Sequence, residues 1–277
     1  MKTLAVEGVG LMAPGLAGWA ASRTVLAGER PYVPEPLPAV IATLLPANER
    51  RRTTATVKLA LHAAQEAVDQ AKSPQPPFEK GGWRSRGDFA AAPTVFASSG
   101  GDSEVLDKIC MALTQPDRPV SPTHFHHSVH NTPAGYWAIA TGCTQPSLSL
   151  SAYDGSFAAG LLEAAALAWA EPARVLLIAY DLPLPFPLAE RRAIVAPFAV
   201  ALLLNPVATD PRQATLRLAR IATTAADRLD DPELERLRAG NPAARGLPLL
   251  RAIARRTATR VLLPDGDGAG LSVEVQP

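Results

Sequence analysis

The segment Arg174–Tyr180 carries an unbroken run of apolar residues, and it constrains the fold of this chain more than any other feature. A strand with one face in water alternates apolar and polar residues, whereas a strand covered on both faces has no such alternation. Similar runs occur at Thr3–Gly10, which closes on glycines, and at Phe198–Leu204. The pattern predicts an α/β domain in which helices cover a mostly buried sheet.

Helical periodicity falls between these apolar runs. Apolar residues recur every three to four positions from Ala55 to Val68, and the segment Ser156–Ala170 is rich in Ala and Leu. A further helix is expected over Pro133–Thr141. The short strand Thr94–Ala97 precedes a turn, and a helix is expected to begin near Asp102. A short strand at Ser147–Ser151, the Ser156–Ala170 helix and the Arg174–Tyr180 strand follow one another, which makes a right-handed crossover if the two strands are parallel.

The rest of the chain contains one predicted insertion and several predicted C-terminal elements. Residues 73–92 combine Pro, Gly and mixed charge without a period, which predicts an exposed loop. Beyond residue 205, the sequence predicts a strand at Ala214–Thr223, a helix at Pro248–Arg256, and a hairpin that joins Arg260–Leu263 to Leu271–Val275.

Composition excludes several functional classes. The chain has 277 residues with 27 basic and 26 acidic side chains, so its net charge of +1 provides no field that would attract nucleic acid. Two cysteines do not make a disulfide framework and indicate a reducing, cytoplasmic setting. No stretch has the length of a membrane span, and the N-terminus lacks a signal-peptide pattern, so we expect a soluble protein. Gly8-x-Gly10 lacks the third glycine of a dinucleotide-binding loop, and no cofactor is expected.

An ordered set of motifs between residues 121 and 156 resembles a known family. The set comprises Ser121-Pro122, Asn131, Ala134-Gly135, Gly142, Pro146 and Ser151-Ala152-Tyr153-Asp154-Gly155-Ser156. Their order and spacing resemble the N-terminal half of the ketosynthases of the thiolase-like superfamily. The resemblance implies a thiolase-like fold with a mixed, mostly parallel five-stranded sheet flanked by helices. It also implies a ketosynthase-like domain over residues 1–205, with residues 206–277 as a C-terminal extension packed on the same domain.

The sequence departs from the ketosynthase pattern where that family carries out its chemistry. Ketosynthases place a cysteine at the elbow between a strand and a helix, because a thiolate at a helix N-terminus has a low pKa and accepts an acyl group. Asp154 stands at that position, and no histidine follows Asn205. Cys110 and Cys143 lie elsewhere along the chain and are interpreted as small core residues. We therefore expect no catalytic residues for condensation.

Asp154 has two interpretations. A carboxylate just before the Ser156–Ala170 helix is an ordinary cap that accepts backbone N–H bonds. The alternative is a residual catalytic role in the hydrolysis or decarboxylation of acyl thioesters.

Inactive ketosynthase-like chains act as chain-length factors, and this chain resembles most the short ones of aryl polyene pigment clusters. The resemblance implies an active ketosynthase as partner in a heterodimer, and an acyl carrier protein as a second candidate partner. The implied tunnel and interface residues are Val120, Thr123, Phe125, His126 and Asn131. Phe125 is the candidate stopper of the acyl tunnel, since a bulky side chain limits length sterically. The alternative is that these residues only pack a homodimer or the monomer core.

Four histidines lie in His124-Phe125-His126-His127-Ser128-Val129-His130. His126 and His130 are four apart and would share a helix face, as metal ligands do, but no carboxylate or cysteine accompanies them. Interface or surface histidines are the favoured interpretation, and no metal is expected. Three functions therefore remain: a non-catalytic chain-length factor, an acyl-thioester hydrolase or decarboxylase that uses Asp154, and a homodimeric scaffold.

Overall fold

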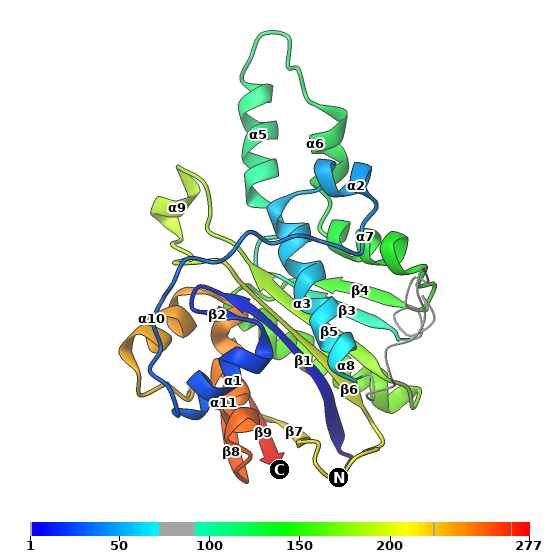
Figure 1. Ribbon diagram of the computed structural model, residues 1–277. Helices are drawn as coiled ribbons and strands as arrows, with labels where there is room; N and C mark the ends of the chain where they lie inside the picture. The colour runs from blue at the N-terminus through cyan, green and yellow to red at the C-terminus, as the bar shows by residue number, and fades with distance from the viewer. Residues whose placement is uncertain (1, 72–91, 224, 267) are drawn as a thin grey trace.

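A nine-stranded sheet lies at the centre of the computed structural model, which describes residues 2–71, 92–223, 225–266 and 268–277 (Figure 1). The strands are β1 (Leu4–Ala13), β2 (Leu16–Ala17), β3 (Thr94–Ala97), β4 (Ser147–Leu150), β5 (Val175–Asp181), β6 (Phe198–Asn205), β7 (Thr215–Ala222), β8 (Thr259–Gly266) and β9 (Ala269–Gln276). The longer helices are α1 (Trp19–Ala27), α3 (Ala55–Ala71), α5 (Ser103–Leu113), α7 (Thr132–Thr141), α8 (Ser156–Ala170), α10 (Pro232–Gly240) and α11 (Leu247–Arg255). Shorter turns of helix are α2 (Ala47–Arg52), α6 (Pro122–His127), α9 (Leu188–Arg191), η1 (Tyr153–Gly155) and η2 (Ala243–Gly246).

The strand order is β4-β3-β5-β6-β1-β7-β9-β8, and β2 pairs with β1. Within the described residues only β3 makes parallel pairings, with β4 and β5, and the other pairings are antiparallel. The prediction of a mixed sheet between helices is confirmed, but the prediction of a mostly parallel, five-stranded sheet is wrong. Burial on both faces produces continuous apolar strands whichever way they run, so β5 and β6 have the sequence of parallel strands although they pair antiparallel.

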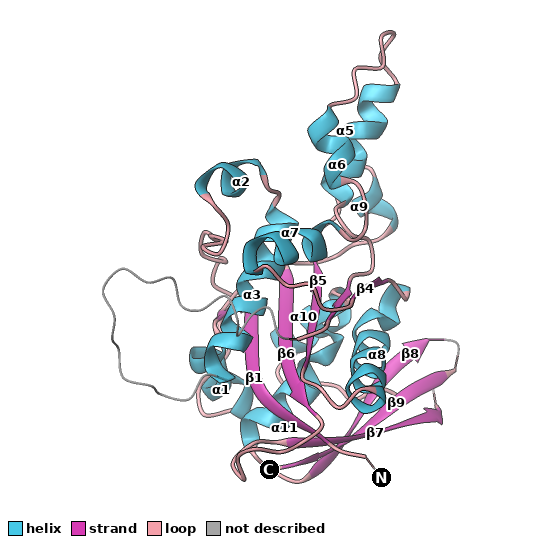
Figure 2. Ribbon diagram, turned by 90° about the vertical axis from the view of Figure 1, so that its right-hand side faces the viewer, coloured by secondary structure: helices cyan, strands magenta, loops and turns pink. Residues whose placement is uncertain are grey.

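Helices cover both faces of the central strands (Figure 2). Alternate residues of β5 and β6 face two separate clusters, since successive side chains of a strand point to opposite faces. On the side of α8 and α11 lie Val175, Leu177, Ala179, Phe198, Val200, Leu202 and Leu204, and on the side of α3 and α7 lie Leu176, Ile178, Tyr180, Ala199, Ala201 and Leu203. This sheet therefore has two separate hydrophobic cores.

Helix α3 packs against β1 at the distance of direct backbone contact. A Cβ atom added to Gly8 would lie 1.9 Å from the main-chain oxygen of Ala67, and one added to Gly10 would lie 1.9 Å from that of Ala63. Neither position tolerates any side chain, and the facing alanines are fully buried. The Gly8-x-Gly10 pair thus serves helix packing.

Strands β7, β9 and β8 extend the same sheet from β1 to the C-terminal hairpin, which is confirmed as predicted. Helices α1 and α10 had no clear sequence signal. The predicted insertion at 73–92 lies outside the described residues except for Ala92, which is buried. Helices α5 and α6 project together from the body of the molecule (Figures 1 and 2). In the described part of the chain, no helix is long and apolar enough to cross a bilayer.

We predict that Gly10→Ala lowers the free energy of unfolding by about 3 kcal/mol, at the upper end of overpacking costs, because α3 must move away from β1. Gly135→Ala on α7 is the matched control: nothing lies within 4 Å of its added Cβ, so it should be neutral or stabilising by up to about 1 kcal/mol. Urea unfolding followed by circular dichroism measures both. Wild-type stability of Gly10→Ala would contradict the packing argument.

Candidate functional site

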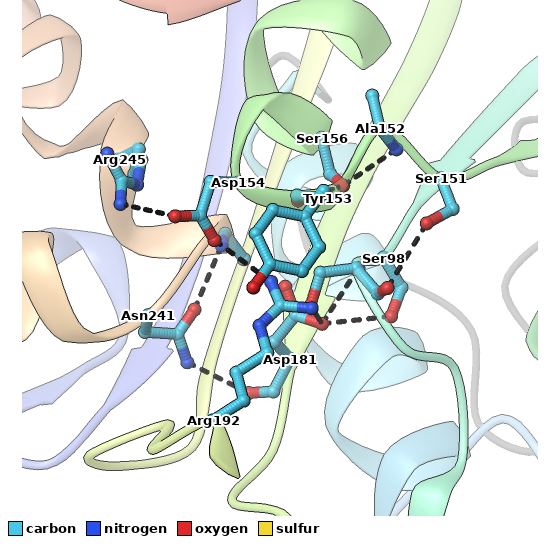
Figure 3. Close-up of polar contacts among 12 residues, drawn as sticks. Ser98, Ser151, Ala152, Tyr153, Asp154, Ser156, Asp181, Arg192, Asn241 and Arg245 are labelled. Atoms are coloured by element: carbon cyan, nitrogen blue, oxygen red, sulfur yellow. Dashed lines mark hydrogen bonds and ion pairs between the residues drawn. The ribbon is translucent and has the colours of Figure 1, made fainter. Parts of the chain in front are cut away.

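A tight elbow joins β4 to α8, and Tyr153 has a left-handed backbone at its centre, with a φ of 49°. The Ser156 hydroxyl holds the turn, since it accepts a hydrogen bond from the Ala152 N–H at 3.0 Å and donates one to the Tyr153 carbonyl at 2.7 Å (Figure 3). Strained strand-to-helix turns present a side chain to the outside, and the Tyr153 side chain is 62% exposed. The strained residue of this elbow is therefore Tyr153, one position before Asp154.

Asp154 forms ion pairs with two arginines. One carboxylate oxygen lies 2.9 Å from Arg192 and the other 2.9 Å from Arg245 of η2. The guanidinium of Arg192 also lies 3.7 Å from the centre of the Tyr153 ring, a cation–π distance. The prediction that Asp154 caps α8 is wrong. The N-cap residue is Gly155, and α8 has no side-chain capping bond. Two guanidiniums are better partners for this carboxylate than the free N–H groups of the helix, and both come from distant parts of the chain.

Asp181 ends β5 beside this elbow and is 1% exposed. One of its carboxylate oxygens accepts hydrogen bonds from the Ser98 hydroxyl at 3.1 Å, the Ser99 N–H at 2.9 Å and the Ser99 hydroxyl at 2.8 Å. The Asn241 amide donates to the main-chain oxygen of Asp181 at 3.1 Å. Burial raises the pKa of Asp181 to about 6, although the bonds from Ser99 and Ser98 and the nearby charge of Arg192 act in the opposite direction.

The pKa of Asp181 predicts a dependence of stability on pH. The unfolded chain loses this proton near the ordinary value of 3.8, whereas the folded protein retains it up to about pH 6. Between these values the unfolded state binds fewer protons, so the free energy of unfolding falls as the pH rises. At about 1.36 kcal/mol per pKa unit, the loss amounts to about 3 kcal/mol. Asp181→Asn cannot ionise and should lack this loss.

Urea unfolding between pH 4 and pH 7 measures the effect as the difference between wild type and Asp181→Asn. Asp117→Asn, at an exposed position, is the control and should retain the wild-type pH dependence. Parallel pH profiles for wild type and Asp181→Asn would show that the Asp181 carboxyl ionises normally in the fold.

Neither cysteine belongs to the elbow. Cys110 is exposed on α5, which contradicts its interpretation as a core residue, and Cys143 is partly buried after α7, where its thiol faces the carbonyl of Ala92 at 3.6 Å. Helix α5 projects into solvent, and only Ser103 and Val105 of it are buried, so an apolar residue type on α5 does not imply burial. The elbow offers a phenol, a carboxylate and two guanidiniums in place of a thiol.

The predicted tunnel and interface residues lie along the projecting arm formed by α5 and α6. Thr123 and His126 are exposed on α6, and Phe125 is 68% exposed there. Val120 lies just before α6 and is partly buried, and Asn131 is the N-cap residue of α7, without a side-chain capping bond. These five residues therefore lie in one stretch of the chain, from just before α6 to the start of α7.

The break between α6 and α7 separates His130 from the other three histidines of the cluster, which lie on α6. His126 and His130 do not share a helix, because α6 ends at His127. His127 is buried and its Nε2 lies 2.9 Å from the Tyr136 hydroxyl, while the Nε2 of His130 lies 3.1 Å from the carbonyl of Leu150. Burial lowers the pKa of His127. Over residues 2–71 and the described segments after residue 91, no group of three metal-ligating side chains could hold an ion.

Sequence reasoning missed the residues that surround Asp154. Arg192 and Arg245 follow it by 38 and 91 positions, and no motif connects them. Asp181 carried a signal, since a carboxylate directly after a buried apolar strand is unusual. The positive φ of Tyr153 has no signal in the residue type.

Comparison with known proteins places the chain in a family. The family model described as "Beta-ketoacyl synthase, N-terminal domain" matches residues 80–264, more than half of the chain. Among solved structures, the fold is similar to a chain of the ketosynthase ApeO in complex with its chain length factor ApeC from Xenorhabdus doucetiae, with a TM-score of 0.72, 22% identity, and coverage of 99% of this chain and 100% of that one.

Two further structures share the fold. A chain of the ishigamide ketosynthase/chain length factor matches with a TM-score of 0.72 at 14% identity over 99% of each chain. A ketosynthase from module 6 of the bacillaene synthase of Bacillus subtilis matches with a TM-score of 0.55 at 11% identity, over 83% of this chain and 43% of that one. No curated protein matches the sequence. The chain has a thiolase-like fold and belongs to the beta-ketoacyl synthase N-terminal domain family.

Proposed function

We propose that this chain is a non-catalytic chain-length factor of the aryl polyene type, which pairs with an active ketosynthase and shapes the tunnel for its growing acyl chain. The elbow is the observation that carries the proposal. Where a condensing enzyme needs a thiolate, Tyr153 lies under Arg192, and both oxygens of Asp154 are held by arginines. A phenol is a poorer acyl acceptor than a thiolate.

The same contacts argue against the alternative of catalysis by Asp154. A general base must have a free oxygen that can reach a substrate proton, and each oxygen of Asp154 is engaged by an arginine. An acyl-thioester hydrolase or decarboxylase that uses Asp154 is therefore disfavoured. Turnover of an acyl thioester by the purified chain, lost in Asp154→Asn, would contradict this conclusion.

The surface around the arm supports a protein partner. Strand β4 lies at one end of the sheet, so one of its backbone edges is unpaired within the described chain. Large apolar side chains stand exposed on β4 (Leu148) and on the neighbouring α7 (Ile139), and further ones on α6 (Phe125) and just after it (Val129). Exposed apolar side chains next to a free strand edge are typical of a surface that another chain covers. A ketosynthase is the partner that we propose, since two similar structures are described as a ketosynthase with a chain length factor.

The domain organisation is part of the proposal. Residues 1–205 form the ketosynthase-like part, and residues 206–277 form an extension packed on the same domain, with β7 bonded to β1. One similar structure is described as a ketosynthase in complex with an acyl-carrier protein, which makes a carrier protein a second candidate partner.

We predict that the chain co-purifies with a ketosynthase of the same organism when the two are produced together, and that Ile139→Asp abolishes this association. A charge at a desolvated interface position costs several kcal/mol, whereas the exposed Val207→Asp, in the loop between β6 and β7, should retain it. Size-exclusion chromatography with light scattering measures both. A stable homodimer of the chain alone, without affinity for any ketosynthase, would support the scaffold alternative instead.

Phe125→Ala tests the stopper. In the complex with ketosynthase, removal of this exposed ring should lengthen the acyl product, because the tunnel end loses a bulky group. Mass spectrometry of the released products measures chain length. Thr123→Ala on the same helix is the control, because it removes little volume and should leave product length unchanged. Unchanged products from Phe125→Ala, with the complex intact, would exclude Phe125 as the stopper.

A further inference from the structure

A cleft opens at the end of the sheet opposite the elbow. Arg174 precedes β5 at this end, while Asp181 ends the same strand at the elbow. The cleft has a volume of about 690 Å³, within the range of small-molecule sites, and Pro277 is among its lining residues. Its walls come from the start of β1, the end of α3, helix α1, the loop between β6 and β7, and the segment after α11.

Four arginines from four separate segments line this cleft: Arg23, Arg174, Arg212 and Arg256. Two of them are neutralised locally. Arg174 lies 2.8 Å from Glu7, whose side chain is only 3% exposed, and Arg212 lies 2.7 Å from Asp210. These two ion pairs engage the carboxylate side chains among the lining residues.

The other two arginines have no carboxylate partner among the described residues. Arg256 donates to the main-chain oxygen of Arg212 at 3.1 Å, and Arg23 has no ion pair or hydrogen bond with any described residue. The bond from Arg212 is the main reason why the pKa of Asp210 falls to about 2, and the charge of Arg256 adds to it, which indicates that Arg256 lies close by. Counted over its described side chains, the cleft therefore carries two uncompensated positive charges.

We propose that this cleft binds a small phosphorylated molecule, with its phosphate dianion held by Arg23 and Arg256. Guanidinium groups bind phosphate oxygens through paired N–H donors, and a dianion matches the two free charges. Beside the arginines, the cleft wall includes Trp19 and Ile253, which provide apolar surface for the organic part of a ligand. The site is independent of the elbow and of partner binding at the arm.

Inorganic pyrophosphate and inorganic phosphate are the probes, titrated calorimetrically into the full chain at low ionic strength. We expect one saturable site, and weakening by roughly tenfold or more in Arg23→Ala and in Arg256→Ala, since hydrogen bonds to charged groups carry about 1.5 to 3 kcal/mol. Arg260→Ala is the matched control: Arg260 is exposed on β8, beside Glu274, and does not line the cleft. This control should bind as wild type does.

Thermal unfolding provides a second measurement. A ligand that binds the folded state raises the midpoint of unfolding, so pyrophosphate should raise it for wild type and Arg260→Ala and not for the double variant Arg23→Ala, Arg256→Ala. The unliganded midpoints show whether each variant is folded, and Arg23→Gln replaces any alanine variant that is not. The proposal is wrong if wild type binds neither probe at millimolar concentration, or if the cleft variants bind the probes as wild type does. It is also wrong if the chain binds vesicles of phosphatidylglycerol but neither probe.

Discussion

The close approach of α3 to β1 is the contact on which the rest of this fold depends. Two strand glycines face two helix alanines, and the helix carbonyls occupy the space where side chains would be. This contact fixes α3 over the centre of the sheet, because β1 lies between β6 and β7. It thereby closes the core on the α3 and α7 side of the sheet. Both strand positions must lack a side chain, and only glycine meets this requirement.

The sequence predicted the elements better than their arrangement. The boundaries of α8, β3 and β6 follow from apolar runs and periodicity, which are local properties. The orientation of β6 against β5 is not a local property, because it depends on the path of residues 182–197 between the two strands. An apolar strand has the same sequence pattern in a parallel and in an antiparallel pairing. Helix α10 escaped prediction because it is short and polar overall, and because only Leu234, Leu237 and Arg238 of it are buried.

The same division applies to the elbow. The absence of a cysteine from residues 151–156 is visible in the sequence alone, since it concerns which residue types are present. The fate of Asp154 is not, because its two arginines come from the loop after α9 and from η2, and their approach depends on the completed fold. The backbone strain at Tyr153 likewise reflects the turn held by Ser156, and the residue type at position 153 does not reveal it.

Strand β4 has a further consequence for the protein in isolation. An unpaired edge strand is a template on which chains can stack into cross-β aggregates. This strand limits that hazard by its construction: it is only four residues long, it carries two serines, and Pro146, which has no N–H to donate, stands directly before it. Such an edge can offer a few main-chain bonds to one neighbour and yet be too short to propagate a fibril.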